Sequence, residues 1–423
     1  MLAAIAVADI TPPIGTPLQG HYSPHPESRG ILAPLEIRTI VFRSGKTTLA
    51  IITADLTGTP WNLTSRVREA IESRYGIKHQ NILVVASHTH CGPATAPNLA
   101  LKPIPEILQQ IEQAMITSVG DAIKELEPVT LGIGAAAAHF NVNRRPASGG
   151  SQFCANDGGV VDRRVRTLRI DRANGSPLVV LFHYSCHPTT KYGSDGLISP
   201  DYPGFARTRI EQQLGCRAAF LSGCCGNIRP NIVGADGNFV SATPEQLTVV
   251  GDELADAVIR AVRFTRTIED DRLAVAETNV FFPYGSMMAV EEMEKLSKRA
   301  DQARRAEWAK RNLPQARSGL ERSGENSLMQ AMRIGPVGMV AIPGEPMQEI
   351  GYEIERISAG KFPDVWPIGY ANDKIGYLCT PRMYQEGGYE PTAYIAYDRP
   401  APFKDEQRII AENATKLIAA VSG

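Results

Sequence analysis

The chain has 423 residues, of which 43% are hydrophobic and 21% charged, ordinary proportions for a globular protein with a buried core. This composition excludes intrinsic disorder, collagen and coiled coil as the main architecture. The 44 basic and 45 acidic residues leave a net charge of -1, whereas proteins that bind nucleic acid usually carry a basic excess or a basic stripe. We therefore expect no nucleic-acid partner.

The sequence also lacks the marks of membrane insertion and secretion. No apolar run reaches the roughly 18 residues that a membrane span needs. The first residues lack the basic segment of a signal peptide, and Asp9 follows them too early. Seven cysteines at scattered positions are more typical of reduced thiols than of a disulfide framework. We expect a cytoplasmic protein that acts on a small molecule and has no membrane span, and a homo-oligomer is left open.

The first half of the chain alternates short apolar strands with amphipathic helices. Runs of β-branched residues bounded by polar residues predict buried strands, and apolar residues at helical spacing predict the helices. This order favours an α/β fold with mixed sheets and flanking helices. The predicted strands are 49–54, 82–86, 166–170, 178–184 and 218–222, and the predicted helices are 62–75 and 201–214.

The second half of the chain begins near Arg272 in this interpretation. Its pattern predicts strands at 273–282 and 332–342, helices at 290–312, 348–357 and 406–421, and a mobile loop at 315–325. Nothing between the halves resembles a free linker. We expect one large domain over 1–423, with two tightly packed lobes, 1–271 and 272–423, as the alternative.

Two histidines stand at the end of the predicted strand 82–86. His88 and His90 are two residues apart, so their side chains would share one face of an extended chain that turns at Gly92 and Pro93. Two imidazoles at a strand end suit a zinc site. A hydrogen-bonded pair of structural histidines explains the same pattern equally well.

A second histidine pair, His183 and His187, closes the predicted strand 178–184. Either histidine could bind a metal, and one of the two is expected to be structural. On parallel strands the two pairs would converge on one site. Glu345 follows a predicted strand and turn and would add an oxygen ligand, although a charge at a helix N-terminus is the commoner reason for such a glutamate. Catalytic zinc normally takes about three protein ligands and leaves a position for water.

Other motifs fail on their context. Gly132 and Gly134 mimic a dinucleotide loop, but the segment 140–146 that follows does not have a helical pattern, so no cofactor of that kind is predicted. The adjacent cysteines in 223–226 do not have the spacing of a metal motif. The chain also has no G-x-S-x-G or P-loop sequence.

Eight short segments, taken in order, resemble the catalytic domain of the neutral (non-lysosomal) ceramidases. Those enzymes use zinc to hydrolyse the N-acyl amide bond of ceramide, so the resemblance implies a neutral-ceramidase-like α/β catalytic domain. The matching segments are 8–12, 54–58, 87–93, 143–146, 184–189, 226–231, 340–345, and 376–377 with Tyr384 and 389–390.

Residue by residue, the resemblance implies a zinc ion held by His88, His187, Glu345 and the phenol oxygen of Tyr377. It implies that His90 carries protons or stabilises an oxyanion beside the metal.

The resemblance also implies roles for two charged residues. Arg144 would contact the substrate carbonyl or the charge that develops on it, with an ordinary surface charge as the alternative. Asp55 is interpreted as a carboxylate that orients a metal-binding histidine, and a turn or capping aspartate is an equal alternative.

One residue departs from the family pattern. Arg229 occupies the position at which the family carries a serine that is often assigned as nucleophile. A guanidinium cannot be acylated, and its rigid fork suits carboxylate or phosphate. Either zinc-bound water is therefore the direct nucleophile, or the reaction differs from that of the ceramidases, and we expect a polar or anionic substrate. We expect no C-terminal immunoglobulin-like domain of the kind that secreted ceramidases carry, and therefore no lipid-facing role.

The function predicted from the sequence is a zinc-dependent hydrolase that cleaves a carboxamide, ester or lactone. The alternative is a metal-containing relative that does not hydrolyse: a metabolite or sugar binder, a lyase or an isomerase. A scaffold with relic histidines is a third interpretation.

Overall fold

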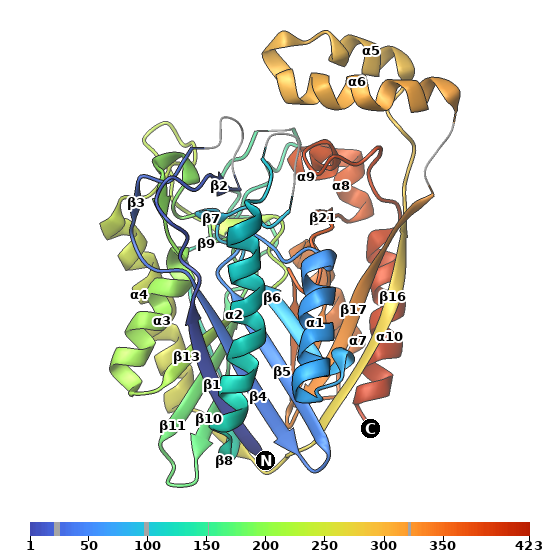
Figure 1. Cartoon of the computed structure of the whole chain (residues 1–423). Coiled ribbons are helices and arrows are strands. Elements are labelled where there is room, and N and C mark those ends of the chain that lie inside the picture. The colour runs from blue at the N-terminus through green and yellow to red at the C-terminus, as the bar shows by residue number, and fades with distance from the viewer. Residues whose placement is uncertain (21–25, 97–100, 151, 320–322) are drawn as a thin grey trace.

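The computed structural model describes residues 1–20, 26–96, 101–150, 152–319 and 323–423 (Figure 1). Within these residues, the largest sheet contains nine strands. Its members are β1 (Leu2–Asp9), β4 (Glu36–Ser44), β5 (Thr47–Ala54), β6 (Ile82–Ala86), β8 (Glu127–Ala137), β10 (Arg164–Arg172), β11 (Pro177–Tyr184), β13 (Arg217–Ser222) and β15 (Arg266–Ile268). The strand order is β13-β11-β10-β8-β1-β4-β5-β6, with β15 paired to β8. Parallel and antiparallel pairs both occur, because β5 pairs β6 and β11 pairs β13 in parallel while the other neighbours run antiparallel.

A second sheet packs face to face on the first. It has the order β16-β17-β18-β20 and consists of β16 (Leu273–Pro283), β17 (Gly324–Ile334), β18 (Val337–Ala341) and β20 (Asp364–Ile368). Side chains alternate along these strands, so Met332 and Met339 join the core shared with the larger sheet, whereas Met329 and Val340 face the opposite side. The shared core ties the two halves of the chain together. That the whole chain folds as one domain stays a prediction.

Helices cover the outer face of each sheet (Figure 1). The larger sheet carries α1 (Trp61–Tyr75), α2 (Pro105–Lys124), α3 (Asp201–Leu214) and α4 (Pro244–Arg263), and the smaller sheet carries α7 (Gln348–Ile357) and α10 (Glu406–Val421). The layers therefore run helix, sheet, sheet, helix. This arrangement confirms the predicted α/β fold with mixed sheets, and α1, α3, α7, α10 and the five predicted strands of the first half all form.

Two predictions for the second half were wrong. The expected single helix 290–312 is a helical hairpin of α5 (Val290–Ser297) and α6 (Ala303–Ser318), which extends away from the sheets in Figure 1. The expected strand 332–342 is two strands, because the chain reverses at Gly335, whose φ of 51° suits glycine.

The predicted mobile loop 315–325 was also wrong in part. The helix α6 continues to Ser318 and ends at Gly319, and β17 begins at Gly324. Residues 320–322 lie outside the described residues.

Four short strand pairs lie beyond the carboxyl ends of the long strands, and three residues discussed below, Arg229, Glu345 and Tyr377, lie in them. They are β2 (Leu18–Gln19) with β7 (Gly92–Pro93), β3 (Gly30–Ile31) with β12 (Leu197–Ile198), β9 (Asn141–Asn143) with β14 (Ile228–Pro230), and β19 (Glu345–Pro346) with β21 (Tyr377–Leu378). Two short helices, α8 (Pro381–Glu386) and α9 (Tyr389–Thr392), lie at the same end of the molecule (Figure 1).

The two edge strands of the larger sheet approach one another at this end. The hydroxyl of Ser222, at the end of β13, lies 3.0 Å from the carbonyl oxygen of Ala86 and 3.1 Å from that of Ser87, just after β6. The segment after β20 bonds to both edges, through Gly369 to Ser222 and through Tyr370 to Ala86. Loops that follow β6, β11 and β13 therefore converge.

No helix in the described part of the chain is long and apolar enough to cross a membrane.

Candidate metal centre

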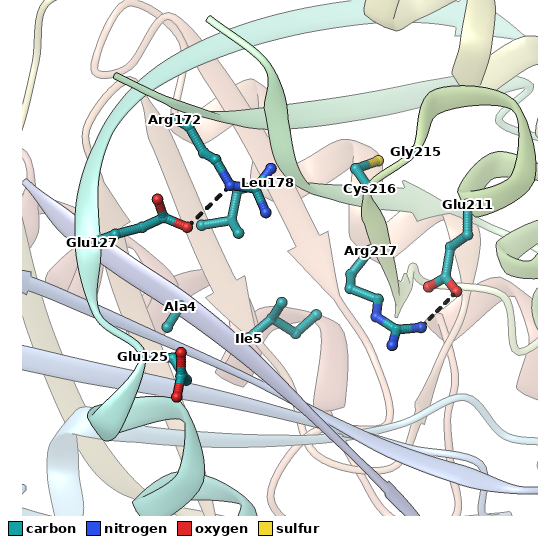
Figure 2. Close-up of a pocket in the computed structure, with 10 residues that line it drawn as sticks. All are labelled: Ala4, Ile5, Glu125, Glu127, Arg172, Leu178, Glu211, Gly215, Cys216 and Arg217. Carbon is teal, nitrogen blue, oxygen red and sulfur yellow. Dashed lines mark hydrogen bonds and ion pairs between the residues drawn. The ribbon is translucent and has the colours of Figure 1, made fainter. Parts of the chain in front are cut away.

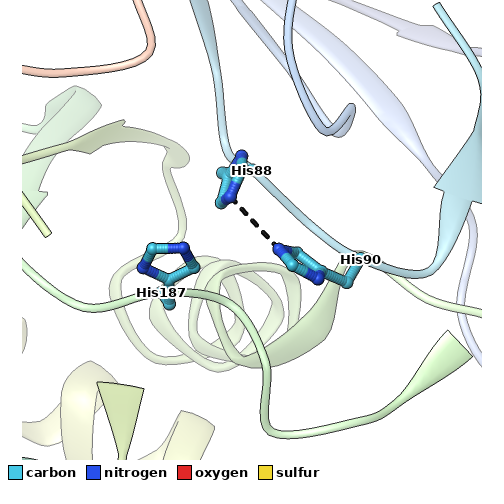
Figure 3. Close-up of side chains that lie close together, drawn as sticks. All are labelled: His88, His90 and His187. Carbon is cyan, nitrogen blue, oxygen red and sulfur yellow. Dashed lines mark hydrogen bonds between the residues drawn. The ribbon is translucent and has the colours of Figure 1, made fainter. Parts of the chain in front are cut away.

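The first histidine pair leaves the sheet at a sharp turn. The strand β6 ends at Ala86, and His88 has a φ of 69°, a left-handed conformation that is uncommon outside glycine. The predicted arrangement, in which His88 and His90 share one face of an extended strand, is therefore wrong. The turn still brings them together, with ring centroids 4.8 Å apart (Figure 3). Nδ1 of His88 donates to the carbonyl oxygen of Thr57 at 2.6 Å, and this bond fixes the tautomer.

His187 reaches the same place from the loop after β11. Its backbone nitrogen donates to the carbonyl oxygen of Ile228, and its Nδ1 donates to the carbonyl oxygen of Cys225 at 2.6 Å. Its ring centroid lies 4.7 Å from that of His88. One ligand nitrogen from each of His88, His90 and His187 falls within 4.8 Å of the others, and Figure 3 shows the three rings facing a common point.

His183, the other histidine of the second pair, is structural. Its Nε2 donates to the carbonyl oxygen of Pro367 at 2.9 Å, and its Nδ1 accepts from Arg166 at 3.3 Å. Both ring nitrogens are thus used within the protein. Burial, and then the positive charge of Arg166, lower the pKa of His183 to about 3.

This lowered pKa predicts a specific acid sensitivity. Below the ordinary histidine pKa of about 6.5, the unfolded chain gains a proton that folded His183 does not accept until about pH 3. Stability is therefore lost as the pH falls through this interval. We expect the melting temperature of His183→Gln to fall less steeply than that of wild type between pH 6.5 and pH 4.5. If the melting temperatures of wild type and His183→Gln fall equally steeply with pH, the lowered pKa of His183 is contradicted.

Glu345 lies between the two buried histidines. It is 1% exposed, and its Oε2 lies 3.2 Å from Nε2 of His88 and 3.2 Å from Nε2 of His187. The backbone of Glu345 is fixed by a bond to Gly376, where β19 pairs with β21. Its other oxygen, Oε1, accepts a hydrogen bond from the hydroxyl of Tyr397. Oε2, by contrast, is buried without a hydrogen-bond partner and faces the two histidines.

The contacts of Glu345 fit a bound cation. Since Nδ1 of His88 and of His187 carries the proton, each Nε2 presents a lone pair to the carboxylate. Burial and the charge of Arg144 lower the pKa of His187 to about 3, so this ring is neutral at pH 7. Nε2 of His187 and Oε2 of Glu345 are buried without a hydrogen-bond partner. Tetrahedral zinc, with bonds near 2.0–2.1 Å, would set its ligand atoms about 3.3 Å apart.

His90 lies at the edge of this cluster and is only half-buried. Its Nε2 lies 3.1 Å from Nε2 of His88. The backbone of Gly20 passes so close that a Cβ there would lie 2.6 Å from the His90 ring, and its φ of 123° also requires glycine. The ring is therefore packed in place beside the two buried histidines.

Tyr377 and Arg144 form a linked pair next to Glu345. Tyr377 is opposite Glu345 in the parallel pair β19–β21. Nη2 of Arg144 donates to the hydroxyl of Tyr377 at 2.9 Å, and Nε donates to Glu390 at 2.9 Å. The guanidinium carbon lies 4.5 Å from the centre of the Phe153 ring. Burial raises the pKa of Tyr377 well above its usual range despite the charge of Arg144, so the free phenol is protonated.

The orienting role suggested for Asp55 does not appear in the structure. Its carboxylate forms a double hydrogen bond with Arg207, at 2.9 and 2.5 Å, and accepts from the backbone nitrogen of Glu36. Backbone carbonyls orient the histidines instead. Asp55 is a buried ion-pair partner that ties β5 to α3.

Arg229 lies on β14, close to the loop that carries His187. Its Nη2 donates to the hydroxyl of Tyr192 at 2.9 Å and to the carbonyl oxygen of Thr189 at 3.3 Å. Its guanidinium carbon lies 4.1 Å from the centre of the Phe239 ring.

Sequence reasoning missed two residues that the structure places at the centre. Tyr397 bonds to Glu345 and so selects which carboxylate oxygen stays free, and Glu390 holds the side chain of Arg144. Glu390 lies in a segment of the family resemblance but carried no assigned role. No pattern in the sequence pointed to Tyr397, because its contact depends on how the chain after α9 folds back over β19.

A separate cavity of about 460 Å³ lies at the opposite end of the larger sheet (Figure 2). It is lined by residues at the start of β11 and β13, such as Leu178 and Arg217, whereas the histidines follow the ends of those strands. Its two arginines are already paired, Arg172 with Glu127 at 3.1 Å and Arg217 with Glu211 at 3.3 Å. The cavity is therefore distinct from the metal centre.

Comparisons with known proteins agree with the fold. The model of the "Neutral/alkaline non-lysosomal ceramidase, N-terminal" family matches residues 2–248. The "Neutral ceramidase" of Mycobacterium tuberculosis is 25% identical over 447 residues, which cover 85% of this chain and 68% of that protein. "Neutral ceramidase B" of Dictyostelium discoideum is 26% identical over 173 residues, covering 36% of this chain and 24% of that protein.

Solved structures show the same fold. The crystal structure of neutral ceramidase from Pseudomonas aeruginosa superposes with a TM-score of 0.75 at 18% identity, over 99% of this chain and 75% of that one. A structure entitled "Ceramidase complexed with C2" gives a TM-score of 0.76 at 17% identity, with the same coverage.

Proposed function

The chain belongs to the neutral/alkaline non-lysosomal ceramidase family, and we propose that it is a zinc-dependent hydrolase of a carboxamide bond, or of an ester or lactone. Its substrate is small and polar or anionic. One observation carries this proposal: the free oxygen of Glu345 lies 3.2 Å from the unprotonated nitrogens of both His88 and His187, and these side chains are buried.

The metal would be held by His88, His187 and Glu345, with the phenol of Tyr377 as a fourth ligand. Two imidazole nitrogens and a carboxylate oxygen are a common ligand set of catalytic zinc. Bound there, zinc would polarise the scissile carbonyl group and lower the pKa of a water molecule towards 7.

His90 and Arg144 would transfer a proton and stabilise negative charge during the reaction. His90 lies beside His88 and is less buried, a position suited to carrying a proton to the leaving amine or alcohol. Arg144 is held by Glu390 and Tyr377 before any substrate arrives. A fixed cation of this kind stabilises the negative oxygen of a tetrahedral intermediate without a reorganisation cost.

A metal-containing relative that does not hydrolyse, such as a metabolite or sugar binder, a lyase or an isomerase, is the second candidate. Arg229 favours it, because the side chain at this position cannot serve as a nucleophile. A cytoplasmic location is also part of our proposal, and the seven free cysteines support it.

The proposal is tested by turnover in H₂¹⁸O. Purified protein is stripped of metal, reloaded with zinc and offered matched amides, esters and lactones. We expect zinc-dependent cleavage with one ¹⁸O in the carboxylate product, and chelator-treated protein is the control. Zinc-dependent turnover without ¹⁸O would favour the lyase or isomerase, and cleavage that is unchanged by chelation would contradict the metal assignment.

A further inference from the structure

Arg229 differs from the other buried arginines of this protein. The described residues include nine buried arginines: Arg38, Arg68, Arg144, Arg145, Arg166, Arg207, Arg229, Arg333 and Arg399. Eight of them have a carboxylate oxygen within 4.0 Å. Arg229 is 6% exposed and has no carboxylate partner among the described residues. A buried charge without an opposite charge beside it strongly destabilises a fold, so a role for this arginine must be sought outside the protein.

The hydrogen bonds of Arg229 are also incomplete. A guanidinium has five N–H groups, and here only Nη2 has partners, Tyr192 and Thr189. Nε is buried without a partner, and the side-chain hydrogen bonds of Arg229 to described residues all leave from Nη2. The hydroxyl of Thr189 is likewise buried without a partner. N–H groups of Arg229 therefore remain available to an acceptor that does not belong to the protein.

Aromatic rings restrict how that group can approach. The guanidinium carbon lies 4.1 Å from the centre of the Phe239 ring and 5.4 Å from that of Tyr192. These contacts recover part of the desolvation cost through cation–π attraction. The rings pack against the guanidinium group, so its free N–H groups are where a ligand would bind.

The ribbon of β9 and β14 places Arg229 beside the reaction centre. Arg229 pairs with Val142, and Arg144 is two residues beyond Val142, so the two arginines share one face of the ribbon. Next to Arg229, the carbonyl oxygen of Ile228 accepts from the backbone of His187. Burial, and in addition the positive charge of Arg144, lower the pKa of Arg229, which agrees with this proximity.

We propose that Arg229 binds a carboxylate of the substrate, so that the enzyme hydrolyses amides that carry a carboxylate close to the scissile bond. The inference rests on the proposed function and names the substrate class for that site. We favour a carboxylate over a phosphate dianion, because Arg144, the other cation that acts on Arg229, is already balanced by Glu390.

The test compares charged and uncharged partners of one substrate. The probes are N-hexanoylglycine with N-hexanoylglycinamide, and N-butylsuccinamic acid with N-butylsuccinamide, which place the carboxylate on the amine side and on the acyl side. Zinc-loaded wild type, Arg229→Gln and the exposed control Arg263→Gln are assayed for kcat/KM and, by titration calorimetry, for binding. Zinc content is measured in each.

We expect wild type and Arg263→Gln to prefer one carboxylate over its carboxamide by about 10- to 100-fold, the range of a charge-assisted hydrogen bond. Arg229→Gln should lose this preference and keep its zinc. Arg229→Lys provides a second variant that keeps the charge but not the fork, and it should recover only part of the preference.

The outcomes separate the two proposals. If no probe is hydrolysed, the proposed function fails for this substrate class, and the binding preference alone then decides the role of Arg229. Equal binding and cleavage of carboxylate and carboxamide by wild type would overturn the inference while leaving a hydrolase. A preference that persists in Arg229→Gln would overturn it as well.

Discussion

His187→Ala and His88→Ala are expected to lose zinc and to lower kcat/KM about a thousandfold or more. Each imidazole is oriented by a backbone carbonyl so that its unprotonated nitrogen faces Oε2 of Glu345. Removing one leaves a metal with too few protein ligands. The metal contributes several kcal/mol to stabilisation of the transition state, which corresponds to a loss of this size.

Zinc content by mass spectrometry and steady-state kinetics measure this effect. His183→Gln is the matched control. His183 is buried near the end of β11, the strand that precedes His187, but both of its ring nitrogens form hydrogen bonds within the protein, with Pro367 and Arg166. It should retain one zinc per chain. Near-stoichiometric zinc in both alanine variants would show that these histidines are not ligands.

Arg144→Ala is expected to lower kcat by about 100- to 1000-fold with zinc retained, the range for loss of one donor to a developing oxyanion. Glu390 and Tyr377 fix the side chain of Arg144. Arg144 itself is not a proposed metal ligand, so His88, His187 and Glu345 should still hold the zinc without it. The loss should therefore fall on kcat rather than on zinc content.

Arg145→Ala is the control for Arg144. Arg145 is buried and donates to the same Glu390, at 2.7 Å, but has no described contact with Tyr377. Both substitutions should destabilise the protein similarly, because each leaves Glu390 with one guanidinium fewer. A similar fall in kcat for both variants would mean that Arg144 acts only through folding.

The sequence predicted the central elements of the fold because their patterns are local. The β-branched runs that form β6 and β11 are buried along their whole length, and such runs have few alternatives to a strand. The segment 332–342 was predicted as one strand, although it contains the turn residues Gly335 and Pro336, where β17 reverses into β18. The resemblance to neutral ceramidases, by contrast, is confirmed by the family match.

Site residues could be predicted where a local pattern, such as a histidine pair at a strand end, marks them. They could not be predicted where their role depends on tertiary contacts. Two histidine pairs at strand ends pointed to His88 and His187. The ion pair of Asp55 could not be predicted, because its partner Arg207 lies 152 residues away on another element. Tyr397 has no motif at all, and its role follows only from its contact with Glu345.

The most direct test of the account is anomalous diffraction at the zinc edge from crystals of the zinc-loaded protein. The account predicts one strong peak per chain, at about 2.0–2.2 Å from Nε2 of His88, Nε2 of His187 and Oε2 of Glu345. A map without a peak at that position, with the two imidazoles turned away from Glu345, would contradict it.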